Sequence, residues 1–350
     1  MTRPLGELLR RKIASSGPIP VAEFMEQCLG HPAYGYYMRK DPLGRAGDFI
    51  TSPEISQIFG ELIGLWAAVV WQIMGEPEPV VLAELGPGRG TLMADFLRAA
   101  ARVPAFRRSL RIHLVETSPT LRRRQRETLK GTELVWLDDV RGLPPGPLLL
   151  VANEFFDALP IRQFVRRGRL WIERRVGLND GDFAFIDGPP VDIAAPLAGE
   201  GDIFEINQPA RDIARWVGQR IASEGGAALV IDYGHPRTAI GDTLQAVRRH
   251  RPAAVLEDPG EADLTAHVDF QALAEAARPA AASPVVPQGV FLRRLGVEPR
   301  ADRLMAAAPE TAADVASACR RLIEPSGMGN LFKVMAITHP GLPNLPGFIH

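Results

Sequence analysis

Short apolar runs alternate with amphipathic stretches through the middle of the chain. The run "VVLAEL" at 80–85 is apolar and β-branched, which predicts a buried strand, and the stretch at 91–100 has apolar residues at helical spacing. Further strands are expected at 110–116, 133–137 and 147–153, and a further helix at 118–129. Strands that alternate with helices in this order predict an α/β fold with a doubly wound, mostly parallel sheet.

The alternation is interrupted between about 161 and 206. Apolar and polar positions on either side of Gly168 predict a β-hairpin, and a stretch rich in Gly, Asp and Pro follows it. We interpret 161–206 as a β-rich insertion, because the strand-and-helix pattern resumes after it. The resumed pattern predicts helices at about 208–223, 269–280 and 309–323, and strands at 226–234 and 331–337.

The first 78 residues predict a separate, mostly helical region. Its centre at 31–53 is dense in Gly, Pro and aromatic residues, which favours an ordered loop, and Ser52-Pro53-Glu54 predicts the start of an apolar helix with Ser52 as its N-cap. We expect residues 1–78 to cover the active site of a catalytic domain at 79–350. The most apolar window, 62–73, is too short to cross a membrane, so we expect a cytoplasmic protein without membrane insertion.

Composition narrows the function classes. Of the 350 residues 46% are hydrophobic, and the formal net charge is -1, so no basic field suggests nucleic acid as a partner. The two cysteines lie far apart, and the seven histidines show no paired ligand spacing, so no metal site is expected.

A glycine-rich turn follows the first predicted strand. The sequence "ELGPGRG" at 84–90 places Gly86, Gly88 and Gly90 before a helix, where the absence of side chains lets a ligand approach the backbone. A dinucleotide fold would have glycine at position 91, which is Thr91. The observed acid-x-G-x-G-x-G spacing is typical of class I methyltransferases that bind S-adenosylmethionine (SAM), and Glu84 suits the ammonium group of SAM.

Acids follow the next two predicted strands. Glu116 ends the second strand, where a carboxylate can accept hydrogen bonds from both ribose hydroxyls. Asp138 or Asp139, after the third strand, could reach the adenine amino group, or both could be solvated turn residues.

Long segments resemble the MidA family of methyltransferases. They are residues 17–66, "ELGPGRGTL" (84–92), "HLVETSP" (113–119), "NEFFDALP" (153–160), "DYGH" (232–235) and "AHVDF" (266–270). The resemblance covers nearly the whole chain, which looks like a bacterial member. It implies a seven-stranded Rossmann-like methyltransferase sheet, with SAM as cofactor and S-adenosylhomocysteine (SAH) as product.

The resemblance also implies a substrate. Mitochondrial members are similar to an assembly factor that symmetrically dimethylates an arginine of a core subunit of respiratory complex I. The expected partner is therefore a protein, the matching subunit of a bacterial enzyme. A methyltransferase for a small molecule or nucleic acid, and a SAM-binding assembly factor without catalysis, are the alternatives.

The segment after the fourth strand holds the candidate catalytic residues. Asn153 is expected to contact the cofactor, and Glu154 is the first candidate for fixing a substrate guanidinium, with Asp157 the second. Asp157 could equally be a helix cap or an ion-pair partner, and Phe155 and Phe156 could be core residues or a substrate cage.

Four further features could face the same crevice. Tyr233 and His235 follow the fifth strand, and His267, close to Thr265, resembles the histidine loop of arginine methyltransferases, although either histidine could be purely structural. The segment 47–56 is expected to fold over the cofactor through Asp48, Thr51, Ser52 or Glu54, and Tyr34 to Tyr37 could close the pocket or pack the two parts together.

Overall fold

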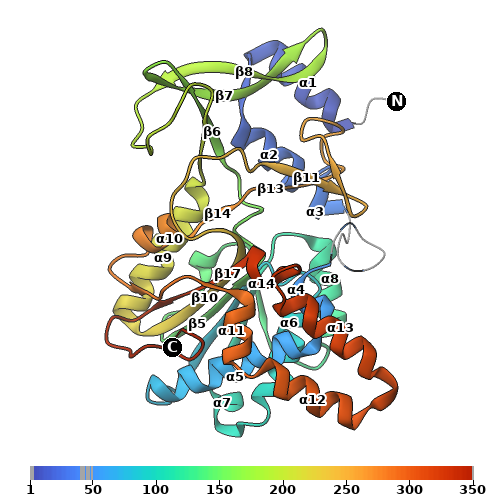
Figure 1. The fold of residues 1–350 in the computed structure, drawn as a ribbon, viewed down its shortest axis with the longest axis vertical. Coiled ribbons are helices and arrows are strands. Elements are labelled where there is room, and N and C mark those ends of the chain that lie inside the picture. Colours follow the sequence, from blue (N-terminus) through green and yellow to red (C-terminus); the bar gives the residue numbers. More distant parts are fainter. Residues whose placement is uncertain (1–3, 40–43, 45–47, 49, 349–350) are drawn as a thin grey trace.

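The computed structural model describes residues 4–39, 44, 48 and 50–348. It has two lobes that are stacked along the long axis of the molecule (Figure 1). The lower lobe contains the large sheet and most of the helices. The upper lobe contains the N-terminal helices and two smaller sheets.

The large sheet confirms the predicted doubly wound topology. Its strand order is β15-β17-β10-β5-β2-β3-β4, in which β2, β3, β4, β5 and β10 pair in parallel and β17 is antiparallel to β10. The two-residue strands β14 and β16 pair with β10 and β17. The sheet therefore has nine strands, where seven were expected. The bounds are β2 Val80–Leu85, β3 Leu110–Val115, β4 Val135–Leu137, β5 Leu148–Asn153, β10 Gly226–His235, β14 Val268–Asp269, β15 Ala281–Ala282, β16 Val286–Pro287 and β17 Phe332–Thr338.

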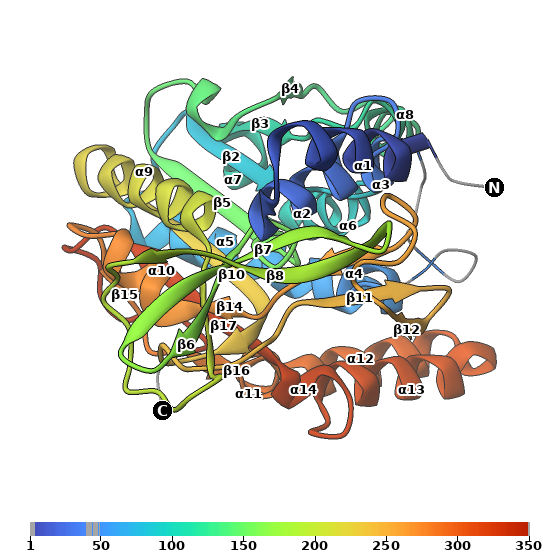
Figure 2. The same cartoon turned by 90° about the horizontal axis from the view of Figure 1, so that it is seen from above.

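Helices cover both faces of this sheet. One face packs on a core that includes Leu82 and Leu149, and it is covered by α5 Gln57–Ile73, α6 Thr91–Ala100, α7 Pro104–Ser109, α11 Gln288–Arg294, α12 Val297–Ala307, α13 Ala312–Ile323 and α14 Met328–Leu331. The other face, with Val81 and Leu148, is covered by α9 Gln208–Glu224 and α10 Phe270–Ala276 (Figure 2). Successive residues of one strand thus reach opposite cores, as expected for a sheet buried on both sides.

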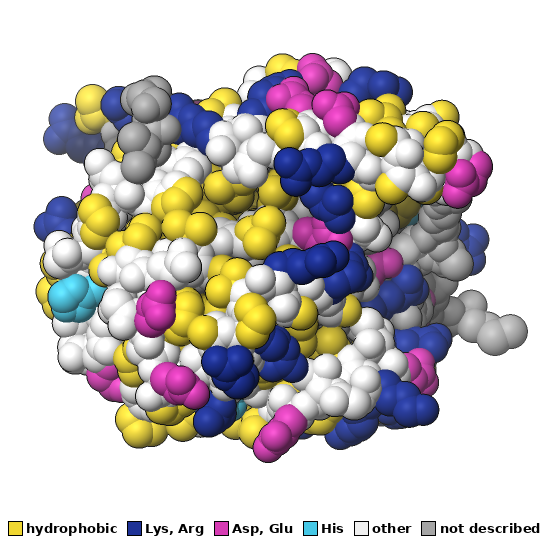
Figure 3. Space-filling model, turned by 90° about the horizontal axis from the view of Figure 1, so that it is seen from below, with side chains coloured by type: hydrophobic (Ala, Val, Ile, Leu, Met, Phe, Trp, Pro, Cys, Tyr) yellow, Lys and Arg dark blue, Asp and Glu magenta, His cyan; other side chains and the backbone are white. Residues whose placement is uncertain are grey.

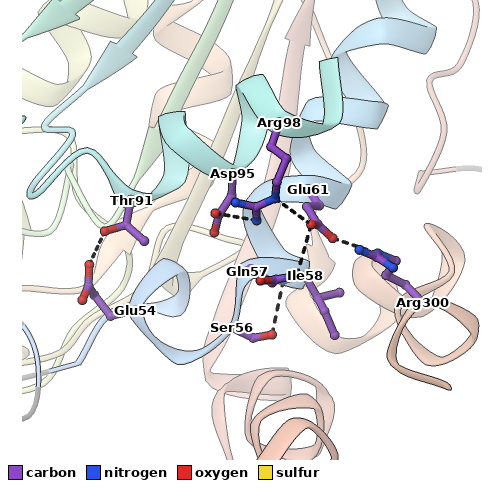
Figure 4. Close-up of polar contacts among 9 residues, drawn as sticks. All are labelled: Glu54, Ser56, Gln57, Ile58, Glu61, Thr91, Asp95, Arg98 and Arg300. Carbon is purple, nitrogen blue, oxygen red and sulfur yellow. Dashed lines mark hydrogen bonds and ion pairs between the residues drawn. The ribbon is translucent and has the colours of Figure 1, made fainter. Parts of the chain in front are cut away.

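Helices α5 and α6 approach each other closely. A Cβ atom on Gly60 would lie 2.6 Å from the Cβ of Asp95, so only glycine fits there. Buried Glu61 accepts hydrogen bonds from Arg98 at 3.1 Å and from Arg300 of α12 at 2.8 Å, which joins three helices (Figure 4). Viewed from below, this end of the molecule shows hydrophobic side chains among charged ones of both signs (Figure 3).

The upper lobe combines segments that are distant in the sequence. Its helices are α1 Pro4–Ser16, α2 Val21–Gly30 and α3 Tyr36–Arg39; its strands are β1 Ile19–Pro20, β6 Arg162–Arg167, β7 Leu170–Asn179, β8 Asp182–Val191, β9 Ile203–Ile206, β11 Gln245–Arg248, β12 Arg251–Ala253 and β13 Asp263–Thr265. One of the two smaller sheets consists of β1, β6, β7, β8 and β9, and the other consists of β11, β12 and β13. The expected hairpin around Gly168 is formed by β6 and β7. Leu5, Phe24, Val176 and Leu264 share one core, so the N-terminal helices, the insertion and the segment around β13 pack together.

The boundary expected at residue 78 stays a prediction. Helix α5 lies before it but packs on the large sheet with α6, whereas α1 packs against β7 in the upper lobe. Within the described residues, no helix is long and apolar enough to cross a membrane.

Three local expectations were wrong. The apolar helix does not run on from Ser52: a short helix, α4 Ser52–Ile55, is followed by Ser56 in extended conformation, whose side chain accepts from the Ile58 N–H and caps α5. The stretch 31–53 is not all loop, since it contains α3, and its residues 40–43, 45–47 and 49 lie outside the described residues. The helix expected at 269–280 ends at Ala276, because Pro279 cannot continue it.

Candidate active site

The glycine turn at the end of β2 has a backbone that favours glycine. Gly86, Gly88 and Gly90 have φ values of 61°, 53° and 82°, in the left-handed region that residues with a Cβ avoid. A Cβ atom on Gly86 would also lie 2.9 Å from the Phe155 ring. The turn leads into α6, whose first N–H groups have no partner within the helix.

Two acids predicted from the sequence lie at this turn. Glu84 is 3% exposed, its Oε2 accepts no hydrogen bond from the described residues, and burial raises its pKa to about 8. Glu116 follows β3, and its Oε1 accepts from the Ser118 N–H at 2.7 Å. Burial raises the pKa of Glu116 as well, against hydrogen bonds that lower it.

A cavity of about 290 Å³ opens over these residues. It lies between the lobes, where the carboxyl ends of β2, β3 and β5 meet, the usual ligand position in open α/β sheets. The lower lobe contributes chiefly Glu84, Gly86, Pro87, Gly88, Arg89, Thr91, Leu92, Glu116, Asn153, Glu154 and Phe155, and the N-terminal segment contributes Glu26, Leu29, Gly30, Tyr37, Met38, Thr51, Pro53 and Glu54.

Glu154 sits at the end of β5 in a strained conformation. Its φ is 52°, which is uncommon for a residue with a side chain. Its Oε1 accepts from the Ser52 N–H at 2.9 Å and from the Asn153 amide at 3.1 Å. Burial, with a smaller contribution from the Asp157 charge, raises the pKa of Glu154 to about 7, so this carboxyl can gain or lose a proton near neutral pH.

The turn after Glu154 is held by Asp232, which sequence reasoning did not single out. Asp232 lies in β10 and is fully buried, and its Oδ2 accepts from the N–H groups of Phe155, Phe156 and Asp157 at 3.2, 2.9 and 3.3 Å. Its place in "DYGH", directly after a buried apolar strand, was the available signal. Asp232 therefore fixes the backbone that presents Glu154.

Asp157 lies behind the cavity wall rather than in it. It is 6% exposed, and burial raises its pKa to about 6 against the Tyr233 hydroxyl, which lowers it. Phe155 lines the cavity, whereas Phe156 is a core residue.

The two candidate histidines lie elsewhere. His235 and His267 line a separate, smaller cavity of about 40 Å³. The His267 ring packs edge-to-face against the Tyr233 ring, with 5.6 Å between the ring centroids. Burial lowers the pKa of His267, so its ring is held in the neutral form. The structure brings neither histidine to the cavity that contains Glu154.

Asp138 and Asp139 also lie outside this cavity. Asp138 is solvent-exposed and pairs with Arg122 at 2.7 Å, and Asp139 caps a short 3-10 helix (Val140–Gly142) and pairs with Arg141. This geometry corresponds to the alternative of solvated turn residues, and a role in adenine binding stays an untested prediction.

Helix α4 covers one side of the cavity. Glu54 accepts a hydrogen bond from Thr91 at the start of α6 (Figure 4), and Ser52 donates its N–H to Glu154. Helix α4 is therefore tied both to the helix that follows the glycine turn and to the segment that follows β5. Asp48 instead accepts from Tyr36 at 2.7 Å. Gly47 and Phe49 of the predicted covering segment lie outside the described residues.

Gln125 is a further residue that sequence reasoning missed. It lies fully buried in α8 Pro119–Thr128, and its Nε2 donates to the Gly88 carbonyl at 2.8 Å and to Glu116 Oε2 at 3.3 Å. Its Oε1 accepts from the Trp136 indole at 2.8 Å. Gln125 thus joins the glycine turn, the acid after β3 and strand β4.

Comparisons with known proteins agree with this geometry. The family described as "Putative S-adenosyl-L-methionine-dependent methyltransferase" matches residues 62–287. The chain belongs to this methyltransferase family. The family's enzymes use SAM as methyl donor, and the resemblance to MidA methyltransferases is confirmed.

Relatives match almost the whole chain. The "Protein arginine methyltransferase NDUFAF7 homolog, mitochondrial" of Drosophila melanogaster is 38% identical over 97% of this chain and 85% of its own length. The human mitochondrial protein arginine methyltransferase NDUFAF7 is 36% identical over 95% of this chain and 83% of its own length. A Burkholderia thailandensis protein crystallised with bound SAH has a TM-score of 0.86 at 32% identity, over 98% of this chain and 93% of its own.

Proposed function

We propose that this methyltransferase methylates a protein arginine, by symmetric dimethylation of a core subunit of respiratory complex I. The observation that carries the proposal is the placement of Glu154. Burial raises the pKa of this carboxyl to about 7, and it lies in the cavity wall directly after β5, which we call the acceptor end. Relatives of the chain are named protein arginine methyltransferases. A cytoplasmic location stays a prediction, since the Drosophila melanogaster and human relatives are named as mitochondrial.

The residues around the glycine turn fit SAM. The unpartnered Oε2 of Glu84 suits the ammonium group of the methionine part, and this pairing would remove the cost of a buried lone carboxylate. The carboxylate of Glu116 suits the ribose hydroxyls. Asn153 Oδ1, buried and without a partner among the described residues, adds a second free acceptor beside the cavity.

Glu154 is proposed to act as acceptor and base for the guanidinium. When bound, SAM supplies a methyl group on a positively charged sulfur. Glu154 would accept the proton that a guanidinium nitrogen loses when it takes up this methyl group. The Ser52 N–H and the Asn153 amide hold the other Glu154 oxygen in place, so its orientation is set before the substrate arrives.

The experiment is a label-transfer assay. The purified chain is incubated with methyl-labelled SAM and with complex I, or its core subunits, from cells that lack this protein, and mass spectrometry locates the label. The expected product is symmetric dimethylarginine in one core subunit, formed by the wild type and not by Glu154→Gln. Label on a residue other than arginine, or in a small-molecule or RNA fraction only, would contradict the proposal.

A further inference from the structure

Helix α4 is too short to hold its own position over the cavity. It is a single turn, in which the N–H groups of Glu54 and Ile55 donate to the Thr51 carbonyl at 3.0 and 3.2 Å, and the extended Ser56 separates it from α5. One isolated helical turn is unstable in water, because few hydrogen bonds offset the ordering of its backbone. The position of α4 is therefore set by the groups that it contacts.

Glu54 fastens α4 to the residues around the glycine turn. Its Oε1 accepts from the Thr91 hydroxyl at 2.5 Å (Figure 4), and its Oε2 lies 3.5 Å from Nη1 of Arg89. The Glu54 side chain is only 17% exposed, so water competes little for these contacts. One carboxylate thus joins α4 both to the glycine turn and to the helix that follows it.

Ser52 joins the other end of α4 to Glu154. Its N–H donates to Glu154 Oε1 at 2.9 Å, and its buried hydroxyl donates to Gln288 Oε1 of α11 at 3.4 Å. The Ser52 N–H lowers the pKa of Glu154 against burial, because it stabilises the charged form of the carboxyl. The position of Ser52 therefore affects how readily Glu154 loses its proton.

The charged groups that face Glu154 belong to elements other than α4. They lie on the segment after β5, on β10, on β13 and on α13, and they are Asp157, Asp232, Asp263 and Arg321. A change of Glu54 can thus act on Glu154 through the charge of Glu54 or through α4. Removal of a negative charge lowers the pKa of a neighbouring carboxyl, whereas loss of the Ser52 N–H raises it. The sign of the shift distinguishes the two effects.

We propose that Glu54 is a positioning residue for Glu154: by anchoring α4 at Thr91, it keeps the Ser52 N–H on the carboxylate that accepts the proton. The inference rests on the proposed role of Glu154 in methylation. One helical turn from the N-terminal segment thus joins the glycine turn to the acceptor end of the cavity.

The test is the titration of Glu154 itself, followed by NMR in the full chain with isotope-labelled glutamate carboxyl groups and saturating SAH. The signal that is missing in Glu154→Gln belongs to Glu154. In Glu54→Ala and in Thr91→Val, the pKa of Glu154 should be about one unit higher than in the wild type, as expected for loss of a hydrogen bond to a charged group. Glu54→Gln should not raise it, because the amide oxygen still accepts from Thr91.

Glu61→Gln is the matched control. Glu61 also joins a helix to α6, through Arg98, but it lies on α5 and does not line the cavity (Figure 4). This variant should lower the melting temperature, because it removes one partner of a buried ion pair, and leave the pKa of Glu154 unchanged. An equal rise of that pKa in Glu61→Gln and in Glu54→Ala would overturn the inference, because general loosening would then explain both.

An unchanged pKa of Glu154 in Glu54→Ala would also overturn the inference. A lower pKa would do the same, since it is the effect of the lost charge alone. SAH binding reports folding in every variant. If Glu54→Ala no longer binds SAH, Thr91→Val, which removes only the donor, decides by the same outcomes.

The label-transfer assay separates the two proposals. If arginine is methylated and the inference holds, the pH at which activity rises should also move up by about one unit in Glu54→Ala. Arginine methylation together with a Glu154 pKa that does not respond to Glu54 would remove the inference and leave the proposed function. A Glu54-dependent pKa without label on any arginine would remove the proposed function and leave the positioning role.

Discussion

The two ends of the cavity are built in different ways. The cofactor end consists of Glu84, the glycine turn and Glu116, which follow one another at the ends of two adjacent parallel strands. The acceptor end combines Glu154, which follows β5 of the lower lobe, with Tyr37 of α3 in the upper lobe. The proposed cofactor end is therefore formed largely by a local strand-and-turn pattern, whereas the proposed acceptor end needs residues from both lobes.

The largest expected effect is a loss of methylation when the acceptor end is changed. Glu154→Gln removes the proposed base but keeps the size of the side chain, so methylation should fall by about 10²- to 10⁴-fold. In the wild type, activity should rise with pH through about 7, because Glu154 must lose its proton to accept another. Steady-state rates of the wild type and of Glu154→Gln, measured between about pH 5.5 and 8.5 in steps of about half a pH unit, check the loss of activity and its pH dependence. A flat pH profile together with an active Glu154→Gln would contradict this role.

The next effect lies at the cofactor end. Gly88→Val places a β-branched residue at a φ of 53° beside the cavity, and SAM binding should weaken by about 100-fold or more. Gly131→Val is the matched control, because Gly131 has a φ of 83° with open space around it and does not line the cavity. Its SAM affinity, measured by calorimetry, should match that of the wild type. An equal loss of SAM affinity in both variants would mean that backbone strain alone weakens binding, and not the position of Gly88 at the cavity.

The third effect concerns stability without ligand. Burial raises the pKa of Glu84 to about 8, above the 4.5 of an exposed glutamate, so the folded protein holds a proton that the unfolded chain releases. Stability should therefore fall as pH rises from about 4.5 to 8, by about 1.4 kcal/mol per pH unit for such a carboxyl.

Melting temperatures of the wild type and of Glu84→Gln across this pH range measure the contribution of Glu84. The variant should lose less stability, and the stabilisation by SAH should increase with pH only in the wild type. Parallel curves for the two proteins would show that Glu84 does not titrate as expected.

The smallest expected effect concerns Gln125, which positions Gly88 and Glu116 but does not itself line the cavity. Gln125→Met removes the hydrogen bonds to Gly88 and Glu116, so SAM affinity should fall by about tenfold, with kcat at saturating SAM unchanged. Gln72→Met, at an exposed position of α5, is the control. A fall in kcat with unchanged SAM affinity would argue against a positioning role.

The contrast between the two ends of the cavity also explains which site residues the sequence could predict. Glu84, Gly86, Gly88, Gly90, Glu116 and Glu154 lie in or directly after apolar strands, and the ends of parallel strands meet at one edge of a sheet. The same reasoning was less informative for Asp138 and Asp139, because they follow a strand of only three residues and have arginine partners at the surface.

Asp263 could not be found in this way, and Tyr37 was considered only within the segment Tyr34 to Tyr37, which could close the pocket or pack the two parts together. They are 226 positions apart and meet only because α3 and β13 pack in the upper lobe. The segment around β13 has three short strands without a clear hydrophobic period, so the sheet that they form was not predictable.

The division of the cavity can be measured directly by titrating SAH into Glu116→Gln and Glu154→Gln under identical conditions. We predict that Glu116→Gln, which loses the carboxylate for the ribose, binds SAH at least about tenfold more weakly than the wild type, and that Glu154→Gln binds it equally well. Equal weakening in both variants, or none in either, would contradict two ends with separate tasks.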